Sequence, residues 1–463
     1  MRGILGWGAY LPYRRLDRAT IPPVAGSGGG TGTRTVAGYD ENSTTMGVEA
    51  ARLALRRSDV APRTLWFTTT EPAYLDKTNA TAVHAALGLD RTAAAYDTVG
   101  SVRSAMGALR AALDGDGPSV VVAADLRTGL PGGPDEAAGG DGAAALLVGS
   151  DADGPVLAEL VAWTSVTEEF LDRWRTPGDP AAKLWEERFG ATRYAELGTE
   201  AVKLALHDAA LGPGQVSALI VAGLPDRAAK AVAGASGVAA GQVRDRLADR
   251  VGNVGAAQPA LLLAAELESA RPDQIILLVT LSDGVDVAVL RTTSALPRYQ
   301  PVRPVAGQLA AGAPVGYGTY LAWRGMLPVE PPRRPEPARP SAPAAWRNRD
   351  WKFGFVGSAG EDGMIRLPPS SLDQARSPMA AAAGTIVTFT VDRLAYSPSP
   401  PVVFAVVDFD GGGRLPVELT DVDEHELRIG GRVEMTFRRL FTADGVHNYF
   451  WKARPRRNET GEH

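Results

Sequence analysis

The chain has 463 residues, of which 45% are hydrophobic and 22% are charged, and its formal net charge is -5. This composition is typical of a globular protein with more than one domain, and the negative charge disfavours nucleic acid as a partner. The chain contains no cysteine, which excludes disulfides, thiolate metal sites and every mechanism that uses a cysteine nucleophile.

We expect no targeting signal in the first residues. Met1–Leu16 lacks the apolar core of a signal peptide, because three glycines and Pro12 interrupt its apolar residues. The longest apolar runs, such as Ile275–Leu281, have the length of a strand and are too short to span a bilayer. We therefore expect a cytoplasmic protein that has no membrane partner.

Val24–Arg34 is rich in glycine and holds one backbone conformation only with support from the rest of the fold. Two interpretations stay open, a disordered surface loop or a loop that closes over a ligand. Glycine content alone reports backbone freedom and does not decide between them.

An internal repeat organises the chain before the proline-rich segment. Each copy contains a helix, a short apolar strand, a second helix, a glycine turn that opens a third helix, and two closing strands. In the first copy the elements are Thr44–Arg57, Thr64–Thr70, Asn79–Leu87, Gly100–Leu113, Ser119–Ala124 and Ala143–Val148. In the second copy they are Thr199–Leu211, Val216–Gly223, Arg227–Gly234, Gly252–Leu267, Gln274–Thr280 and Val285–Leu290.

Alternating helices and strands predict α/β layers, and the duplication predicts two halves related by a pseudo-twofold axis. Acidic glycine turns separate the closing strands, at Gly140-Asp141-Gly142 and at Ser282-Asp283-Gly284. The repeat also aligns Ser101 with Asn253, each at the start of a helix. We expect these two residues to face one central cleft.

The last quarter of the chain differs in composition. Pro328–Pro343 is dense in proline, which forbids helix interiors and favours an extended connector. Five short β-rich runs then predict a small all-β barrel. They are Gly384–Arg393, Pro401–Phe409, Arg414–Thr420, Arg432–Phe437 and His447–Ala453.

Seven segments before the proline-rich connector match one known pattern. They are Gly32–Arg34, Asp40–Thr45, Tyr74–Thr81, Ala124–Arg127, Gly140–Ala145, Glu169–Arg175 and Gly252–Gly255. Together they resemble the thiolase superfamily, and closely its 3-hydroxy-3-methylglutaryl-CoA synthase branch. The resemblance implies αβαβα layers over residues 1–325, with pseudo-repeats at about 1–165 and 166–325, and a homodimer formed through this domain.

The barrel resembles the OB-fold domains that accompany thiolase-like acyl-CoA enzymes, where a zinc ribbon usually precedes it. We expect a linker at 326–345 and a ribbon with an OB-fold barrel at 346–460. Gly360 and Gly363 stand where the ribbon's CxxC pair belongs, so no zinc or other metal is expected.

Without zinc, the ribbon must be held by packing, and Trp346, Trp351 and Phe353 are the aromatic residues available for it. Acidic residues in the barrel argue against a groove for single-stranded nucleic acid. The resemblance instead implies a role in guiding acyl-thioester substrates or in bridging a dimer.

The resemblance implies a mechanism in which a cysteine is acylated, a glutamate moves a proton, and a histidine and an asparagine polarise carbonyl oxygens. Val102 stands where the cysteine belongs and Gly223 where the histidine belongs, so both groups are missing. Ser101 and Ser104 lie close by and would act as nucleophiles only with a base beside them. Helix capping is the alternative role of Ser101.

Two polar residues remain as the main catalytic candidates. Glu71 ends a strand within one residue of the family's general acid/base position, and burial beside an apolar cleft would raise its pKa usefully. Asn253 matches the family's asparagine and would donate to an oxyanion. A solvated turn for Glu71 and a helix cap for Asn253 stay open, and Asp97 is a third carboxylate near the altered helix start.

The matching segments also place Arg34, Gly252 and Gly255 at expected ligand-binding positions. No cofactor is expected beyond the CoA or carrier-protein pantetheine that forms part of an acyl-thioester substrate.

Three functions follow from these residues. The favoured one is a lyase or transferase that performs aldol, retro-aldol or cyclising chemistry on a β-keto or β-hydroxy acyl thioester of polyketide type, without a covalent intermediate. The second is a non-catalytic scaffold or binding protein in a biosynthetic pathway. The third is a hydrolase or acyltransferase that uses Ser101 or Ser104, and it lacks the histidine base.

Overall fold

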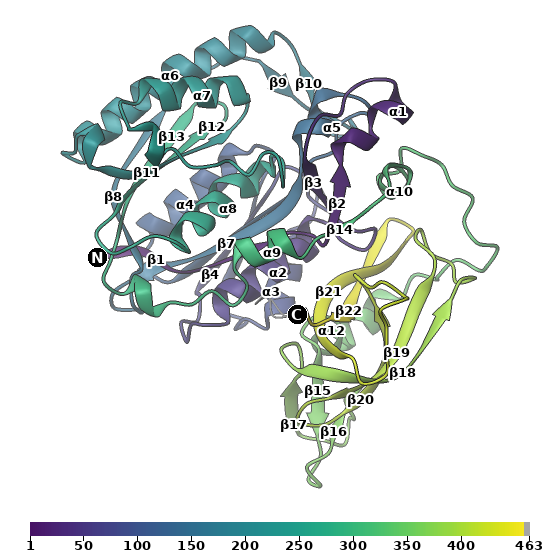
Figure 1. Ribbon diagram of the computed structural model, residues 1–463. Helices are drawn as coiled ribbons and strands as arrows, with labels where there is room; N and C mark the ends of the chain where they lie inside the picture. The colour runs from purple at the N-terminus through teal and green to yellow at the C-terminus, as the bar shows by residue number, and fades with distance from the viewer. Residues whose placement is uncertain (458–463) are drawn as a thin grey trace.

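Nine strands of the first part of the chain form one sheet in the computed structural model, which describes residues 1–457 (Figure 1). The strands are β1 (Arg2–Tyr10), β4 (Thr64–Thr69), β5 (Ala94–Val99), β6 (Ser119–Leu126), β7 (Asp141–Ser150), β8 (Ala158–Val166), β11 (Val216–Gly223), β12 (Ile275–Leu281) and β13 (Val285–Thr292). Their order is β11-β12-β13-β8-β1-β7-β6-β4-β5. β1 and β8 meet through two residue pairs, so the sheet consists of two loosely joined halves.

The two halves have the same topology. In the first, β4 is parallel to β5 and β6, and β7 is antiparallel to β6 and β1. In the second, β11 is parallel to β12, and β13 is antiparallel to β12 and β8. The counterpart of β5 is reduced to a parallel bridge between Leu219 and Val243. The predicted duplication is confirmed.

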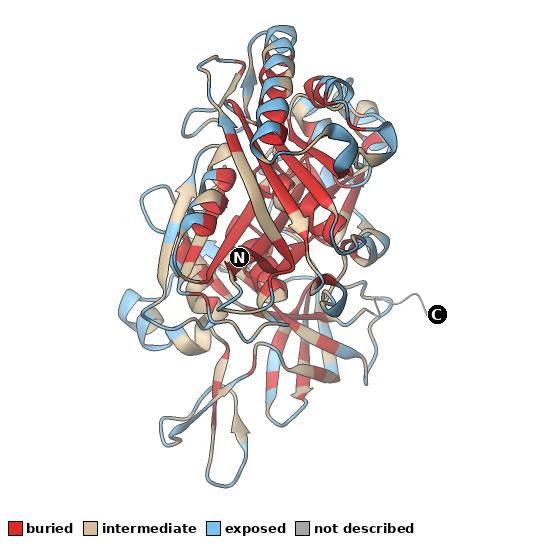
Figure 2. Cartoon of the chain, turned by 90° about the vertical axis from the view of Figure 1, so that its left-hand side faces the viewer, coloured by how far each residue is buried: buried red, intermediate tan, exposed pale blue. Residues whose placement is uncertain are grey.

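Three pairs of helices cover and separate the two halves. They are α2 (Ser43–Leu55) with α3 (Ala80–Leu87), α4 (Arg103–Asp114) with α8 (Gln258–Leu267), and α6 (Glu187–Asp208) with α7 (Asp226–Ala235). α4 and α8 lie between the halves in the largest core, and nearly every residue of α8 is buried, as a central helix requires. The outer helices α6 and α7 pack on the second half and expose their other faces (Figure 2). The predicted αβαβα order is confirmed.

Some element boundaries differ from the expectation. β1, β5 and β8 were not predicted, and α6 begins at Glu187 instead of Thr199. Asp141 does not lie in a turn but starts β7, where its fully buried carboxylate pairs with Arg34 and Arg324. The charge of Asp141 suggested an exposed turn. The arginines that neutralise it are distant in sequence, so the sequence did not indicate that Asp141 lies in a buried strand.

The last quarter forms a closed barrel of β18 (Ala383–Asp392), β19 (Val402–Phe409), β20 (Arg414–Leu419), β21 (Arg432–Ala443) and β22 (Val446–Pro455), as predicted. Before it, β15 (Val356–Ala359), β16 (Ile365–Arg366) and β17 (Ala375–Pro378) form the ribbon. The shorter elements are β2 (Arg14–Asp17), α1 (Pro22–Ala25), β3 (Thr33–Val36), α5 (Pro134–Ala138), β9 (Arg173–Trp174), β10 (Lys183–Leu184), α9 (Val305–Ala310), β14 (Ala313–Pro314), α10 (Tyr317–Trp323), α11 (Ala342–Arg347) and α12 (Arg349–Lys352). No helix within residues 1–457 combines the length and apolar character needed to cross a membrane.

The ribbon is held by charges and aromatic rings. Arg366 passes beside Gly360, where a Cβ would lie 2.0 Å from its Nη1, and forms ion pairs with Asp362 at 2.7 Å and Asp373 at 3.4 Å. Across the described part of the chain, no group of three acidic, histidine or cysteine side chains is placed to hold a metal ion.

The three aromatic residues expected to hold the ribbon behave differently. The ring centroid of Trp351 lies 5.1 Å from that of Phe355, and Phe353 lies 6.0 Å from Phe437 in the barrel. Trp346 is 67% exposed, so the expectation that it packs in the ribbon is wrong. Its place on the short helix α11, which begins in the last residues of the proline-rich connector, leaves its indole in solvent.

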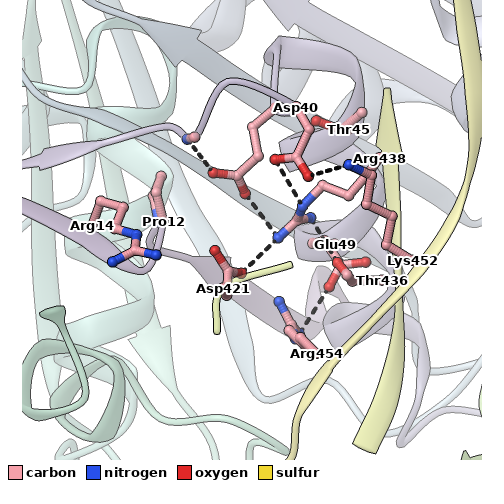
Figure 3. Close-up of polar contacts among 12 residues, drawn as sticks. Pro12, Arg14, Asp40, Thr45, Glu49, Asp421, Thr436, Arg438, Lys452 and Arg454 are labelled. Atoms are coloured by element: carbon pink, nitrogen blue, oxygen red, sulfur yellow. Dashed lines mark hydrogen bonds and ion pairs between the residues drawn. The ribbon is translucent and has the colours of Figure 1, made fainter. Parts of the chain in front are cut away.

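The barrel packs against the α2 side of the layered domain through a buried charge network (Figure 3). Arg438 on β21 is fully buried and lies 3.1 Å from Glu41, 3.0 Å from Asp421 and 3.7 Å from Asp40. Lys452 on β22 is also fully buried, and its Nζ lies 3.0 Å from Asp40. The acidic pair that precedes α2 therefore serves as an anchor for the barrel.

Candidate functional site

A cavity of about 490 Å³ lies where the two halves of the layered domain meet. Its wall is built by residues that follow β4 and β11, precede α4 and α8, and connect β12 to β13, together with the segment around β9. β4 and β11 both end at this cavity, which is where α/β sheets hold their ligands. Glu71, Ser101, Val102, Gly223 and Asn253 all line it, so the repeat-related Ser101 and Asn253 share one cavity.

Glu71 is held in the cavity wall by contacts to its carboxylate and to its backbone carbonyl. Its carboxylate forms an ion pair with Arg175, whose guanidinium also donates to the Thr70 carbonyl. The hydroxyl of Ser43, at the start of α2, donates to the Glu71 carbonyl oxygen at 2.7 Å. The side chain remains 44% exposed, so a ligand in the cavity has access to it.

Asn253 is fixed by its backbone and by one end of its side-chain amide. Its N–H donates to the Ala138 carbonyl at 2.8 Å, and its carbonyl accepts from Gly140 at 3.0 Å. Its Oδ1 accepts from the Gly255 N–H at 2.9 Å, which is the capping contact expected before a helix. No group within residues 1–457 accepts a hydrogen bond from Nδ2, so this donor is available to a ligand.

The serines near Val102 have no imidazole beside them. The Ser101 hydroxyl donates to Asp283 Oδ2 at 2.7 Å and accepts from the Arg103 N–H at 3.1 Å, so it satisfies one backbone donor at the start of α4. Among the described residues that line the cavity there is no histidine. Ser104 lies on α4, outside the cavity lining.

Asp97 and Arg34 lie outside the cavity lining. The Asp97 carboxylate accepts from the backbone N–H groups of Asn79 and Ala80, both at 2.7 Å, and so caps α3. The Arg34 guanidinium is fully buried, with hydrogen bonds to the carbonyls of Glu136 and Arg127 at 2.6 and 2.7 Å. These contacts occupy both side chains within the fold.

Gly252 and Gly255 also lie at crowded backbone positions. A Cβ on Gly252 would lie 2.2 Å from the Gly139 carbonyl oxygen, and one on Gly255 would lie 2.0 Å from Asp125 Oδ2. Both have positive φ, at +87° and +55°, which favours glycine. Their absence of side chains lets the Asn253 turn approach the ends of β6 and β7.

A larger open groove of about 800 Å³ runs between α6 and α7. Alanines, Leu204 and charged residues such as Glu200 and Lys203 line it, and none of the residues expected to act in catalysis does. The smaller cavity between the halves, which Glu71 and Asn253 line, is therefore the candidate active site.

Comparison with known proteins identifies the layered domain. The hydroxymethylglutaryl-CoA synthase of Aeropyrum pernix is 30% identical to the chain over 345 residues, which cover 71% of the chain and 95% of that relative. The chain belongs to the hydroxymethylglutaryl-CoA synthase family. The relative of the same name from Methanopyrus kandleri is 29% identical over 344 residues and covers 70% of the chain.

Solved structures share the fold of this family member at low identity. MvaS in complex with 3-hydroxy-3-methylglutaryl coenzyme A has a TM-score of 0.57 and 22% identity, with 73% of this chain and 94% of that chain covered. The 3-oxoacyl-(acyl carrier protein) synthase III of Pseudomonas aeruginosa has a TM-score of 0.55 and 19% identity, with 63% and 98% covered. The barrel matches the family described as ChsH2, C-terminal OB-fold domain, over residues 378–438. The predicted resemblance and fold class are confirmed.

The cavity of this synthase-family protein contains charged residues that the sequence did not single out. Arg127, Asp172, Arg175 and Asp283 all line it. Three of them belong to segments that carried the family resemblance, and Asp283 lies in the second acidic glycine turn. The segments that contain these charged residues were therefore recognised, but the sequence could not show that the segments meet in one cavity.

The barrel of this family member supports the loop that carries Glu71. The backbone N–H of His447 on β22 donates to the Tyr74 hydroxyl at 2.8 Å, and their ring centroids lie 5.1 Å apart. The Asn42 amide also donates to the Tyr449 hydroxyl at 2.8 Å. The OB fold thus contacts the Glu71–Tyr74 loop directly.

Stability is expected to fall as pH drops from about 6.5 to about 4, in part because of His447. Burial, and next the charge of Arg439, lower the pKa of His447 from 6.5 to about 4. In this window the unfolded chain binds a proton that the folded chain does not, so acid favours unfolding. Urea unfolding at several pH values should show a shallower decline for His447→Gln than for the wild type.

His425→Gln is the control for this pH dependence, because the His425 side chain is 86% exposed. It should leave the slope of stability against pH unchanged. Identical slopes for His447→Gln and the wild type would contradict a half-buried His447 with a lowered pKa.

Proposed function

We propose that this synthase-family protein binds an acyl thioester in the cavity and catalyses aldol-type carbon–carbon chemistry without a covalent acyl-enzyme. The observation that supports it most is the pairing of Glu71 with an unoccupied Asn253 amide donor in one open cavity. The substrate of the protein would be a β-keto or β-hydroxy acyl group, carried as a thioester on CoA or on carrier-protein pantetheine.

In the condensing direction, the Glu71 carboxylate removes a proton from the carbon next to the thioester carbonyl. The Asn253 Nδ2–H group donates to the enolate oxygen that develops. The enolate carbon then bonds to the carbonyl carbon of the acceptor, whose C=O π bond breaks, and the alkoxide oxygen takes up the proton that Glu71 removed. Cleavage follows the same steps in reverse, so neither direction needs a nucleophilic side chain.

The two alternatives have less support. A non-catalytic scaffold has no need of an open cavity lined by charged residues. A scaffold that binds thioesters is the second candidate. A serine-dependent hydrolase has less support because no histidine is among the described residues that line the cavity, and the carboxylate of Asp283 is the acceptor beside the Ser101 hydroxyl.

Incubation with a panel of β-keto and β-hydroxy acyl-CoA thioesters tests the proposal, with calorimetry for binding and chromatography for products. We expect binding, product formation by carbon–carbon bond making or breaking, and an intact protein mass without an adduct. A stable acyl adduct would favour the serine mechanism. Binding without turnover would favour the scaffold.

We also propose a homodimer in which β5 of one copy pairs with β5 of a second. β5 is the edge strand of the large sheet, and its Tyr96 and Val99 are 51% and 40% exposed. Unpaired edges of large sheets are usually covered. Light scattering should give twice the 48.6 kDa mass of one chain, and Tyr96→Lys should shift it toward a single chain. A single-chain mass for the wild type would contradict this arrangement.

A further inference from the structure

A hairpin of residues 173–184 forms one wall of the cavity. It consists of β9, β10 and the turn between them, and most of its residues line the cavity. The two strands pair in antiparallel register through Trp174 and Lys183. Asp179 closes the turn, because it accepts from the Thr176 N–H at 3.1 Å and from the Thr176 hydroxyl at 2.6 Å, and lies 3.1 Å from Lys183 Nζ. The hairpin therefore keeps its shape through contacts of its own.

The hairpin is weakly attached to the rest of the layered domain. Ala181 is the one buried residue in this segment, and the others are half-buried or exposed. Within residues 1–457, hydrogen bonds and ion pairs join the hairpin to more distant parts of the chain at two side chains, Arg173 and Arg175. An element with few buried contacts opens locally at a much lower cost than the core unfolds. The hairpin can therefore move as a unit while both halves of the sheet stay packed.

Arg175 joins the hairpin to the proposed base. Its guanidinium pairs with Glu71 Oε2 and donates to the Thr70 carbonyl. Across the described residues, no group donates a hydrogen bond to the other carboxylate oxygen, Oε1, so this oxygen is available to a substrate proton. A guanidinium that holds one oxygen of a carboxylate fixes the direction in which the other points. The orientation of the Glu71 carboxylate thus depends on the position of the hairpin.

We propose that the hairpin is a lid, which opens to admit the acyl thioester and on closing places Arg175 against Glu71. Arg175 is then a positioning residue, and the base is oriented only when the lid is closed. Closure also shields the developing enolate from water, which would otherwise protonate it. This inference rests on the proposed function for the identity of the ligand and of the base.

Hydrogen exchange of the amides in 173–184, followed by mass spectrometry on the full chain, tests the lid without requiring turnover. Exchange in Arg175→Gln should be about 5- to 30-fold faster than in the wild type, because a charged hydrogen bond and an ion pair are lost. Arg175→Lys should restore part of the protection, and a bound acyl-CoA thioester should slow exchange in the wild type. Arg291→Gln is the control. Arg291 forms a partly exposed ion pair with Glu159 at 3.1 Å and does not line the cavity, so the hairpin should exchange as in the wild type.

Turnover separates a positioning role from a purely structural one. With an acyl thioester that the wild type converts, Arg175→Gln should lower kcat about 10²-fold, as a small misplacement of a catalytic group does. Arg173→Gln frees the hairpin from Asp135 and leaves Arg175 beside Glu71. It should therefore speed exchange in the hairpin and lower kcat much less than Arg175→Gln does.

Wild-type exchange of 173–184 in Arg175→Gln would overturn the inference, whatever the activity of the protein. Fast exchange together with wild-type kcat in this variant would also overturn it, because the lid would not position Glu71. A wild type that neither binds nor converts thioesters would overturn the proposed function and the role of Glu71 as base, while exchange in Arg175→Gln would still decide whether Arg175 holds the hairpin. Equal melting temperatures for Arg175→Gln and the wild type would confirm that the faster exchange is local.

Discussion

Replacing Arg438 with methionine is expected to lower the free energy of unfolding by about 3–5 kcal/mol, the usual cost of removing one member of a buried charge network. Arg438 is fully buried between Asp40 and Glu41 of the layered domain and Asp421 of the barrel. Without it, these carboxylates lose their main shared cation. Urea unfolding followed by tryptophan fluorescence measures the change.

Arg432→Met is the matched control, because Arg432 lies on the same strand and forms an ion pair with Asp410 in which both side chains are substantially exposed, 41% and 57%. Exposed pairs contribute less than about 1 kcal/mol. Losses of similar size in the two variants would show that the buried network does not stabilise the contact between barrel and layered domain.

Glu71→Gln is expected to reduce the turnover of an acyl-thioester substrate about 10²- to 10⁴-fold, in either reaction direction. This is the range over which a general base accelerates proton transfer. The amide keeps the shape of the side chain and cannot take the α-proton. Because the backbone contacts of Glu71 do not involve its carboxylate, we expect thioester affinity and melting temperature to stay close to the wild type.

Glu168→Gln provides the comparison for this variant. Glu168 forms an ion pair with Arg193, is 40% exposed and does not line the cavity, so its loss should leave turnover unchanged. Wild-type turnover in Glu71→Gln would remove Glu71 from the mechanism. A parallel loss of thioester affinity would indicate that the Arg175 ion pair shapes the cavity.

Local patterns were sufficient to predict much of the fold. Short apolar runs and glycine turns placed β11 and four of the five barrel strands within two residues, while β21 extends to Ala443, six residues beyond its predicted end. The repeat placed Ser101 and Asn253 at one cavity. β1 was missed because its glycines suggested an interrupted segment. Gly8 is in fact required for packing, since a Cβ there would lie 2.4 Å from the Ala50 carbonyl oxygen of α2.

The site could be predicted only in part, because its chemistry depends on contacts between distant segments. Asp97 and Glu71 are both carboxylates near the altered helix start, and only the fold shows that Asp97 caps α3 while Glu71 lines the cavity. The ion pairs of Arg173 with Asp135 and of Arg175 with Glu71 were equally hidden, because each joins segments far apart in the sequence.

The contact between His447 and the Glu71–Tyr74 loop also determines how the protein responds to dilution. Barrel and layered domain belong to one chain, so the linker fixes their effective concentration whatever the amount of protein present. Two separate polypeptides with the same contact would dissociate at low concentration and release the loop. In this protein the support of the Glu71 loop is unimolecular, and the activity per chain should not depend on protein concentration through this contact.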